Sequence, residues 1–270
     1  MIFYIIIYLT ILYLICEHIS INRKIKKFLN KIRAYEKSNK CKLIIITDNF
    51  WSQNRRMEKI ISKFVNDIIF SFDDYDEYLF MKICNNVTFN DKEIRIILHT
   101  HGGVSDTAES MCLILSQMKK VSSYIPYYAY SAGSYVALAS KNIYMNQIAF
   151  MGPIDSQVDF KYDNNKIKVS NTDIVKLNKN IKLSKDMGLL FQTNEAKKNF
   201  NYDMYIIKLL LEGNTNSEKI IKEFLLAEYP HDSRMTYQKL KQLNLKNLKP
   251  FNDPDIMRII DEMIKIQKDI

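Results

Sequence analysis

Two short segments of the sequence combine small residues with groups that could support acyl transfer. The first, "HTHGGVSDTAES" (99–110), places Gly102 and Gly103 directly after an apolar run in a chain with only six glycines. The second, "SAGSYVALAS" (131–140), begins with Ser131. Acyl transfer needs a hydroxyl beside backbone amides, because each amide that stabilises the oxyanion contributes roughly 3 to 4 kcal/mol. Taken alone, the same pattern fits a glycine turn and a serine N-cap.

The residues around these segments predict strands that alternate with helices. Strands are expected at 42–48, 93–100 and 121–130, with short strands in 142–152. Residues 57–69 predict an amphipathic helix or a helix that runs into a strand. The helix after the glycine pair is indicated by apolar residues at helical spacing: Ala108, Met111, Cys112, Leu115 and Met118. This alternation implies a parallel sheet with right-handed crossovers, in which ligands gather where strands end and helices begin.

Three segments resemble the serine dehydrogenase proteinase family in their order and spacing. They are "ILHTHGGVSDTAESM", "IPYYAYSAGSYVALAS" and "MGPIDSQ", against the family patterns L-H-T-P-G-G, V-P-x-Y-A-M-S-A/G-G-T and L-G-P-I-D-P-Q. A weaker similarity is "EYPHD" (228–232). The family is more distantly similar to the Clp protease proteolytic subunit and to signal peptide peptidase A. The resemblance implies a crotonase-like spiral of ββα units with a parallel sheet over residues 42–250, and serine-type endopeptidase activity without a cofactor or metal.

The resemblance also assigns roles to residues of the motifs. Ser131 matches the nucleophile. Gly102 and Gly103 match the glycine pair whose amides, with the amide of Ala132, would form the oxyanion hole and bind the substrate carbonyl. Asp155 matches the aspartate of G-P-I-D and is expected to position a loop. Ser134, one helical turn further on, is the poorer candidate for the nucleophile.

The resemblance does not settle the general base. The histidine of Clp-like enzymes would fall near Pro153 or Ile154, where this sequence has none. A lysine is implied instead, as in signal peptide peptidase A, and we favour Lys168 because "KVSN" resembles the segment around the lysine of related archaeal membrane proteases. The alternatives that stay open are Lys176, His101 and His231.

Departures from the family patterns leave other functions open. His101 and Ser156 each replace a family proline. An inactive crotonase-like scaffold that binds a membrane protein is therefore the alternative function. An acyl-CoA crotonase is less favoured, because it would use carboxylates and Glu109 is the only nearby glutamate.

The N-terminus predicts a membrane anchor. Residues 1–16 form a continuous apolar run, and residues 22–42 contain nine Lys or Arg against one Glu. At 1.5 Å per residue the run extends about 24 Å, which is short for a hydrocarbon core of roughly 30 Å but sufficient if the flanking residues lie near the headgroups. We expect a transmembrane anchor at 1–21, a basic juxtamembrane linker at 22–41 and, by the positive-inside rule, a cytoplasmic catalytic domain on a single-pass protein.

Composition favours a folded protein, and the family resemblance implies a peptide or membrane-protein substrate. The chain has 270 residues, 47% of them hydrophobic, and a net charge of +9 that is concentrated in the basic segment rather than spread as a nucleic-acid surface. The four cysteines lack metal-ligand or paired spacing and fit a reducing compartment. The family resemblance further implies a homo-oligomer.

The C-terminal third predicts helices. One is expected from about residue 186 to Glu212, and another is opened by Thr215 and Glu218 as a capping box. Thr236 begins a third. Asp253 and the following proline begin the last helix, within the C-terminal segment 251–270.

Overall fold

A computed structural model of the chain describes residues 2–48, 68–70, 72, 74–89, 92–162, 165–178, 187–226 and 228–268. For some residues within helices and strands, including 2–19, it describes the backbone alone. The expected helix at 57–69 therefore lies almost entirely outside the described residues.

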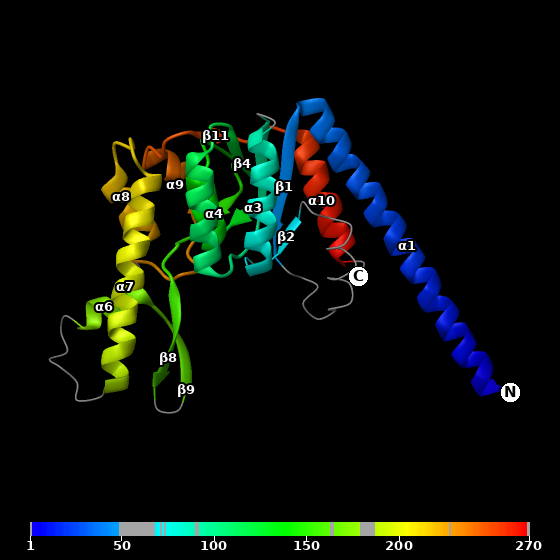
Figure 1. Cartoon of the computed structure of the whole chain (residues 1–270), viewed down its shortest axis with the longest axis horizontal. Helices are drawn as coiled ribbons and strands as arrows, with labels where there is room; N and C mark the ends of the chain where they lie inside the picture. The colour runs from blue at the N-terminus through cyan, green and yellow to red at the C-terminus, as the bar shows by residue number, and fades with distance from the viewer. Residues whose placement is uncertain are drawn as a thin grey trace.

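Six parallel strands form the main sheet of the described part of the chain, in the order β11-β6-β4-β3-β1-β2 (Figure 1). The strands are β1 (Cys41–Thr47), β2 (Ile68–Phe70), β3 (Glu93–His99), β4 (Val121–Ile125), β6 (Asn142–Met145) and β11 (Leu248–Pro250). The expected α/β fold with a parallel sheet is confirmed.

Alternate residues of the central strands face two separate hydrophobic cores. Ile44 and Ile46 of β1 pack in the core that includes side chains of α3 (Asp74–Phe89), α4 (Ser105–Gln117) and α5 (Ala132–Ala139). Leu43 and Ile45 of the same strand pack in the core beneath the N- and C-terminal helices. Because both faces of the sheet are covered, the strand is apolar along nearly its whole length.

The N-terminal helix α1 (Ile2–Asn39) is continuous and contacts α10 (Pro254–Lys268) at the edge of the molecule (Figure 1). Its second half buries four side chains against α10 and the sheet, namely Ile25, Phe28, Ile32 and Tyr35. Residues 22–39, expected as part of a linker, are thus a packed helix, because their apolar residues recur at helical spacing between the lysines.

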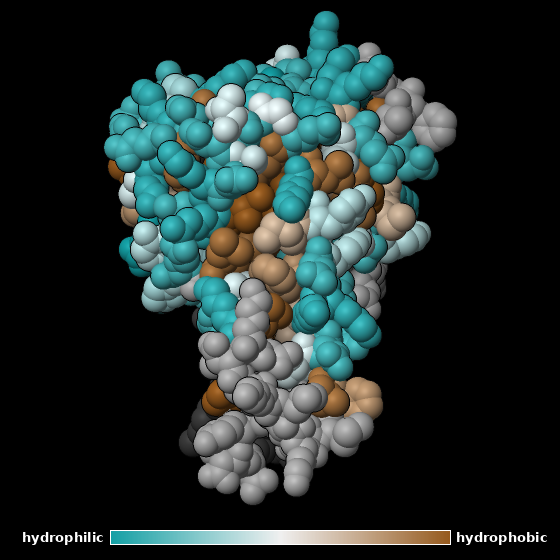
Figure 2. All heavy atoms as spheres, turned by 90° about the vertical axis from the view of Figure 1, so that its left-hand side faces the viewer, coloured by the Kyte–Doolittle hydropathy of each residue, from teal (hydrophilic) through white to brown (hydrophobic). Residues whose placement is uncertain are grey.

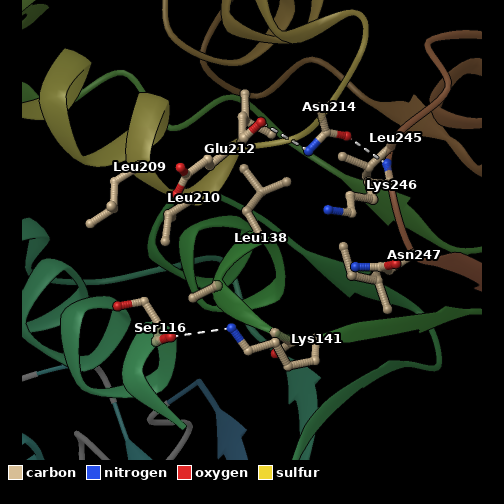
Figure 3. A pocket seen from close by; sticks show the side chains of 14 residues that line it. Ser116, Leu138, Lys141, Leu209, Leu210, Glu212, Asn214, Leu245, Lys246 and Asn247 are labelled. Atoms are coloured by element: carbon tan, nitrogen blue, oxygen red, sulfur yellow. Dashed lines mark hydrogen bonds between the residues drawn. The ribbon is translucent and has the colours of Figure 1, made fainter. Parts of the chain in front are cut away.

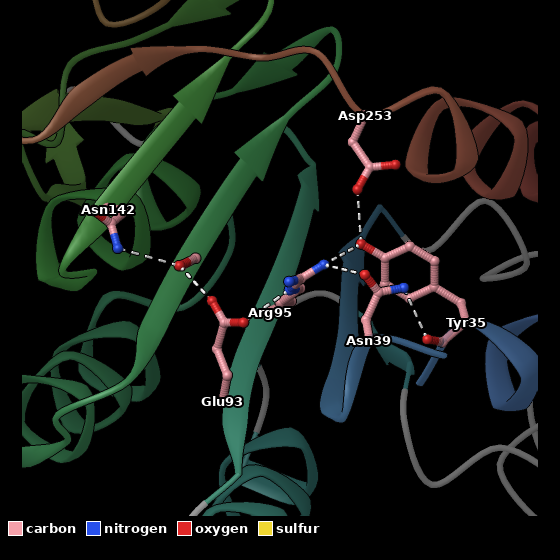
Figure 4. A network of polar contacts seen from close by, with 7 residues as sticks. Tyr35, Asn39, Glu93, Arg95, Asn142 and Asp253 are labelled. Atoms are coloured by element: carbon pink, nitrogen blue, oxygen red, sulfur yellow. Dashed lines mark hydrogen bonds and ion pairs between the residues drawn. The ribbon is translucent and has the colours of Figure 1, made fainter. Parts of the chain in front are cut away.

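A polar network ties both terminal segments to β3 (Figure 4). The Arg95 guanidinium donates to Tyr35 Oη at 2.7 Å and to Asn39 Oδ1 at 3.1 Å. Tyr35 Oη donates in turn to Asp253 Oδ2 at 2.8 Å. Glu93 accepts from the Arg95 side chain at 3.0 Å, so the half-buried guanidinium is paired on both sides.

A second, smaller sheet lies next to the candidate site in the sequence, because Ser131 follows one of its strands by two residues. β5 (Tyr128–Ala129) pairs in parallel with β7 (Phe150–Met151), and β10 (Met235–Thr236) pairs antiparallel with β7. Thr100, directly after β3, forms an isolated parallel bridge with Ala129. In two successive units the chain thus leaves a strand of the main sheet, pairs briefly at this second layer and enters a helix: β3, Thr100 and α4, then β4, β5 and α5.

The single strand expected at 121–130 is in fact two strands. β4 ends at Ile125, and the chain joins the small sheet at Tyr128. Pro126 explains the break, because proline has no amide hydrogen to continue the ladder.

The remaining elements form a hairpin and a group of helices. The hairpin of β8 (Gln157–Tyr162) and β9 (Asn165–Ser170) lies beside α7 in Figure 1. The helices are α6 (Asn171–Asn178), α7 (Met187–Leu210), α8 (Ser217–Phe224) and α9 (Tyr237–Gln242). Figure 2 shows the end of the molecule that carries α6, α7 and α8, where apolar side chains run down the centre between hydrophilic margins.

The predicted caps of these helices are only partly correct. Thr236 caps α9 by accepting from the Lys239 amide, and Asp253 accepts from the first amides of α10. The capping box at Thr215 was wrong: α8 begins after Asn216, whose side chain makes no cap hydrogen bond. Among the residues searched for membrane spans, which are the described ones, no helix is long and apolar enough to cross a bilayer.

Candidate active site

Ser131 lies at the sharp turn between β5 and α5 and has a strained backbone. Its φ of 49° and ψ of −120° fall outside the regions that residues with a Cβ favour. Although it occupies the N-cap position of α5, its side chain makes no capping hydrogen bond. The simple N-cap explanation of this serine therefore fails, whereas a strained strand-to-helix turn is the geometry that exposes a nucleophile.

Gly102 packs directly against Ser131. A Cβ added at Gly102 would lie 2.6 Å from Ser131 Cβ and 3.2 Å from the Ala132 amide nitrogen. The backbone at Gly102 also has a φ of 113°, which L side chains rarely adopt. The structure thus brings the first predicted glycine, the serine and Ala132 together, and glycine is required because there is no space for a side chain.

The amides at this turn are not equivalent. The Gly102 amide donates to Thr100 Oγ1 at 3.0 Å, so it is already engaged within the turn. Ala132 is the first residue of α5, and its amide therefore has no intrahelical acceptor. Gly103, the next residue toward α4, lines a pocket described below.

Ser134 has a structural role. Its fully buried hydroxyl shares its one hydrogen between the carbonyl oxygens of Ala129 at 2.7 Å and Gly152 at 2.8 Å, and accepts from the Gly152 amide at 3.2 Å. These bonds join α5 to the small sheet and leave the hydroxyl inaccessible to a substrate.

His231 and Asp155 form a hydrogen-bonded pair at the same edge of the small sheet. His231 Nδ1 lies 2.8 Å from Asp155 Oδ1, and the carboxylate is almost completely buried. Ser131 follows β5 by two residues and Asp155 follows the parallel strand β7 by four, while His231 precedes the antiparallel strand β10 by four. The register therefore places all three residues beyond the same end of the sheet.

This pair changes the interpretation of the missing histidine. The sequence has no histidine at Pro153 or Ile154, but an imidazole arrives beside Asp155 from residue 231. The two segments that carry the motifs "MGPIDSQ" and "EYPHD" thereby meet in space. Asp155, which was expected to position a loop, thus contacts an imidazole.

His101 forms a second imidazole–carboxylate pair. Its Nδ1 lies 2.6 Å from Asp48 Oδ2, and its amide donates to Asp48 Oδ1 at 2.6 Å. Thr100 Oγ1 and Tyr128 Oη also donate to this carboxylate, at 2.9 and 3.2 Å. Sequence reasoning missed Asp48, although a carboxylate directly after a buried strand was a usable signal.

The two candidate lysines lie on the elements beyond β7. Lys168 is an exposed residue of β9, opposite Asp159 on β8. Lys176 of α6 is also exposed, and its Nζ donates to the Leu226 carbonyl at 2.6 Å. No described contact joins either ammonium group to Ser131.

A pocket of about 320 Å³ opens beside the glycine turn. We call it the acidic pocket, because its walls include Asp106 and Glu109 of α4 and Asp203 of α7. Burial, together with the neighbouring Asp203, raises the pKa of Glu109 to about 9, and burial also raises the pKa of Asp203. Within the described residues, no group of three His, Cys, Asp or Glu side chains is arranged to hold a metal ion.

A second pocket, of about 230 Å³, lies at the far end of α5 (Figure 3). Leu138 and Lys141 border it, and Lys141 Nζ donates to the Ser116 carbonyl at 3.1 Å. It contains none of the candidate catalytic residues, since Ser131 is at the other end of the helix.

Comparison with known proteins tests the resemblance carried by the motifs. The family model for ClpP-like SDH-type serine proteinases matches residues 1–263. The chain belongs to this family. For this member of the ClpP-like SDH-type serine proteinase family, the match extends from α1 into α10 and so covers the first hydrophobic core, most of the second and the motif segments.

The chain is also similar to individual relatives and to a solved structure. Two relatives are uncharacterized proteins of Methanocaldococcus jannaschii: MJ1495, 30% identical over 169 residues, and MJ0137, 28% identical over 160 residues. They match 59% and 57% of this chain, and in each case the chain spans 53% of the relative's length. A mutant of the 1510-N membrane-bound stomatin-specific protease has a TM-score of 0.50 and 17% identity, covering 81% of this chain and 84% of that chain. At this identity the likeness shows a shared fold.

Proposed function

We propose that the protein is a serine peptidase in which Ser131 is the nucleophile, His231 the general base and Asp155 the group that orients the base. The observation that carries the proposal is the 2.8 Å contact between His231 and Asp155 at the sheet edge where Ser131 sits in a strained turn. A serine, a base and an orienting carboxylate are the parts from which such sites are built.

In the proposed reaction the same groups act in acylation of the enzyme and then in hydrolysis of the acyl-enzyme. An extended peptide pairs beside a strand edge, and Ser131 Oγ attacks the scissile carbonyl while His231 takes its proton. The amides of Gly103 and Ala132 hold the oxyanion, and Gly102 leaves room for the substrate to approach. His231 then donates the proton to the leaving amine, and water releases the acyl group by the same steps.

Two other bases are rivals to His231. Lys168, which the motif resemblance favours, would have to lose its water shell, because a solvated ammonium group is protonated at neutral pH and cannot accept a proton. His101 already has a carboxylate partner, Asp48, and is the neighbour of Gly102 in the chain.

Labelling by a fluorophosphonate probe tests the proposal. The wild-type chain should be labelled and Ser131→Ala should not. His231→Ala should lower the labelling rate by about 100-fold or more, the usual scale for a general base, while Lys168→Ala and His101→Ala should stay within a few-fold of wild type. Loss of labelling in Lys168→Ala but not in His231→Ala would restore the serine–lysine dyad. Absence of labelling in the wild type would favour the inactive scaffold.

Membrane attachment and assembly are part of the same proposal. The apolar run at residues 1–16, followed by the basic segment, supports a single-pass anchor with the catalytic domain in the cytoplasm. Exposed apolar residues on α7, such as Phe191 and Leu209, support contact with another subunit. The full chain should need detergent for extraction, whereas a chain starting at Ser20 should stay in the supernatant. Recovery of the full chain in the supernatant without detergent contradicts the anchor.

A further inference from the structure

The acidic pocket adjoins the proposed oxyanion hole. Gly103 lines the pocket and is followed almost directly by α4, whose first turns supply Asp106 and Glu109. Asp203 comes from α7 and Asn171 from the start of α6. A substrate residue whose carbonyl oxygen is held by the Gly103 amide would therefore have this pocket within reach of its side chain.

The pocket holds two buried carboxyl groups. Glu109 is 7% exposed and Asp203 is 1% exposed. Among the described residues that line the pocket there is no Lys or Arg to pair with them. Two neighbouring buried carboxyls resist ionising together, so without a counterion the pair carries at most one negative charge, and a cation entering the pocket would stabilise the ionised form.

Two buried polar side chains of the pocket have atoms without a hydrogen-bond donor or acceptor from the described side chains around them. Asp203 Oδ1 accepts from Ser156 Oγ at 2.9 Å and from Tyr135 Oη at 3.1 Å, whereas Oδ2 has no donor among the described residues other than the neighbouring Glu109 carboxyl. The Asn171 side chain is 1% exposed, and neither its oxygen nor its nitrogen has a partner in the described part of the chain. Buried polar atoms are nearly always hydrogen-bonded in folded proteins, so these atoms point to a bound group.

We infer that the acidic pocket binds the cationic side chain, lysine or arginine, of the substrate residue next to the scissile bond. Asp203 Oδ2, the Glu109 carboxyl oxygens and Asn171 Oδ1 are acceptors that match the several N–H donors of an ammonium or guanidinium group, and a cation in the pocket would favour ionisation of Glu109. An acidic substrate side chain would instead meet like charges. This inference rests on the proposed peptidase function, because it takes the Gly103 amide as the anchor of the substrate backbone.

Peptide binding to a catalytically silent chain tests the inference separately from turnover. Full-length Ser131→Ala in detergent is titrated with fluorescent peptides that differ only in one residue, which is lysine, norleucine or glutamate. The lysine peptide should bind at least about 10-fold more tightly than the others, the scale of one charge-assisted hydrogen bond. Adding Glu109→Gln or Asp203→Asn should reduce this preference to within about 2-fold.

Glu195→Gln is the matched control, because Glu195 lies on the same helix as Asp203 but is exposed and paired with Lys198. It should leave the lysine preference unchanged. Equal or tighter binding of the norleucine peptide, or a preference that survives both pocket variants, overturns the inference. Fluorophosphonate labelling of the wild type without a lysine preference in binding would contradict only the pocket inference. A lysine preference without labelling would contradict only the peptidase proposal.

Discussion

At the scale of single residues, Gly102 is where one added methyl group should do most harm to the site. In Gly102→Ala the new Cβ would meet Ser131 Cβ at 2.6 Å, in a backbone conformation that alanine disfavours. We expect the fluorophosphonate labelling rate to fall by about 100-fold or more, because the turn that holds the oxyanion amides must shift. The free energy of unfolding should fall by about 1 to 3 kcal/mol, the usual cost of such strain.

Gly213→Ala provides the control for this prediction. Gly213 also has a positive φ, 78°, but its Cβ would meet only the flexible end of Lys246. A similar loss of stability with an unchanged labelling rate is expected. Equal labelling rates for the two variants would contradict the close approach of Gly102 to the nucleophile.

Local patterns identified some residues of the site and not others. Ser131 and Gly102 belong to short motifs, and their meeting follows from strands that end at one edge of a sheet. His231 and Asp155 are 76 residues apart, and the pair is visible only once β10 is seen to run antiparallel to β7. Asn171 carries no sequence signal, because only its burial without a partner marks it.

At the scale of elements, the second half of α1 is an integral part of the domain. Its four buried side chains each contribute roughly 1.5 to 3 kcal/mol on burial, which together is comparable to the total stability of a typical domain, 5 to 15 kcal/mol. A chain starting at Lys40 should therefore be aggregated or unfolded. A chain starting at Ser20 keeps these side chains and should show a cooperative unfolding transition by circular dichroism; equal behaviour of the two would refute the packing of α1 on α10.

The high charge of this segment obscured its packed helix in the sequence. Nine basic residues dominate residues 22–42 and indicate a membrane-facing linker, yet Ile25, Phe28 and Ile32 recur at the spacing of one helix face. A helix with lysines on its other face is compatible with both a basic segment near the membrane and a packed apolar face. The central strands were easier to predict, because sheets covered on both faces need long apolar runs.

At the scale of the whole molecule, the acidic pocket is built by α4, α6 and α7 and so forms only when the chain is folded. The protonation of its buried carboxyl groups should therefore affect the stability of the whole fold. Burial holds the pKa of Glu109 far above its value in an unfolded chain, where the carboxyl ionises near pH 4.3. The neighbouring Asp203 and Asp106 also raise the pKa of Glu109. Burial raises the pKa of Asp203 as well. Between the two pKa values the folded state binds more protons than the unfolded state.

Stability should therefore fall as the pH rises from about 4.5 toward 9. Glu109→Gln removes a titrating group without removing its volume, so the decline should be visibly shallower, and the variant should gain stability relative to wild type most strongly near pH 8 to 9. Urea unfolding midpoints at pH 5, 7 and 9 measure the effect. Glu195→Gln, which removes an exposed carboxylate from α7, should keep the wild-type slope. Parallel curves for wild type and Glu109→Gln would mean that folding does not raise the pKa of Glu109.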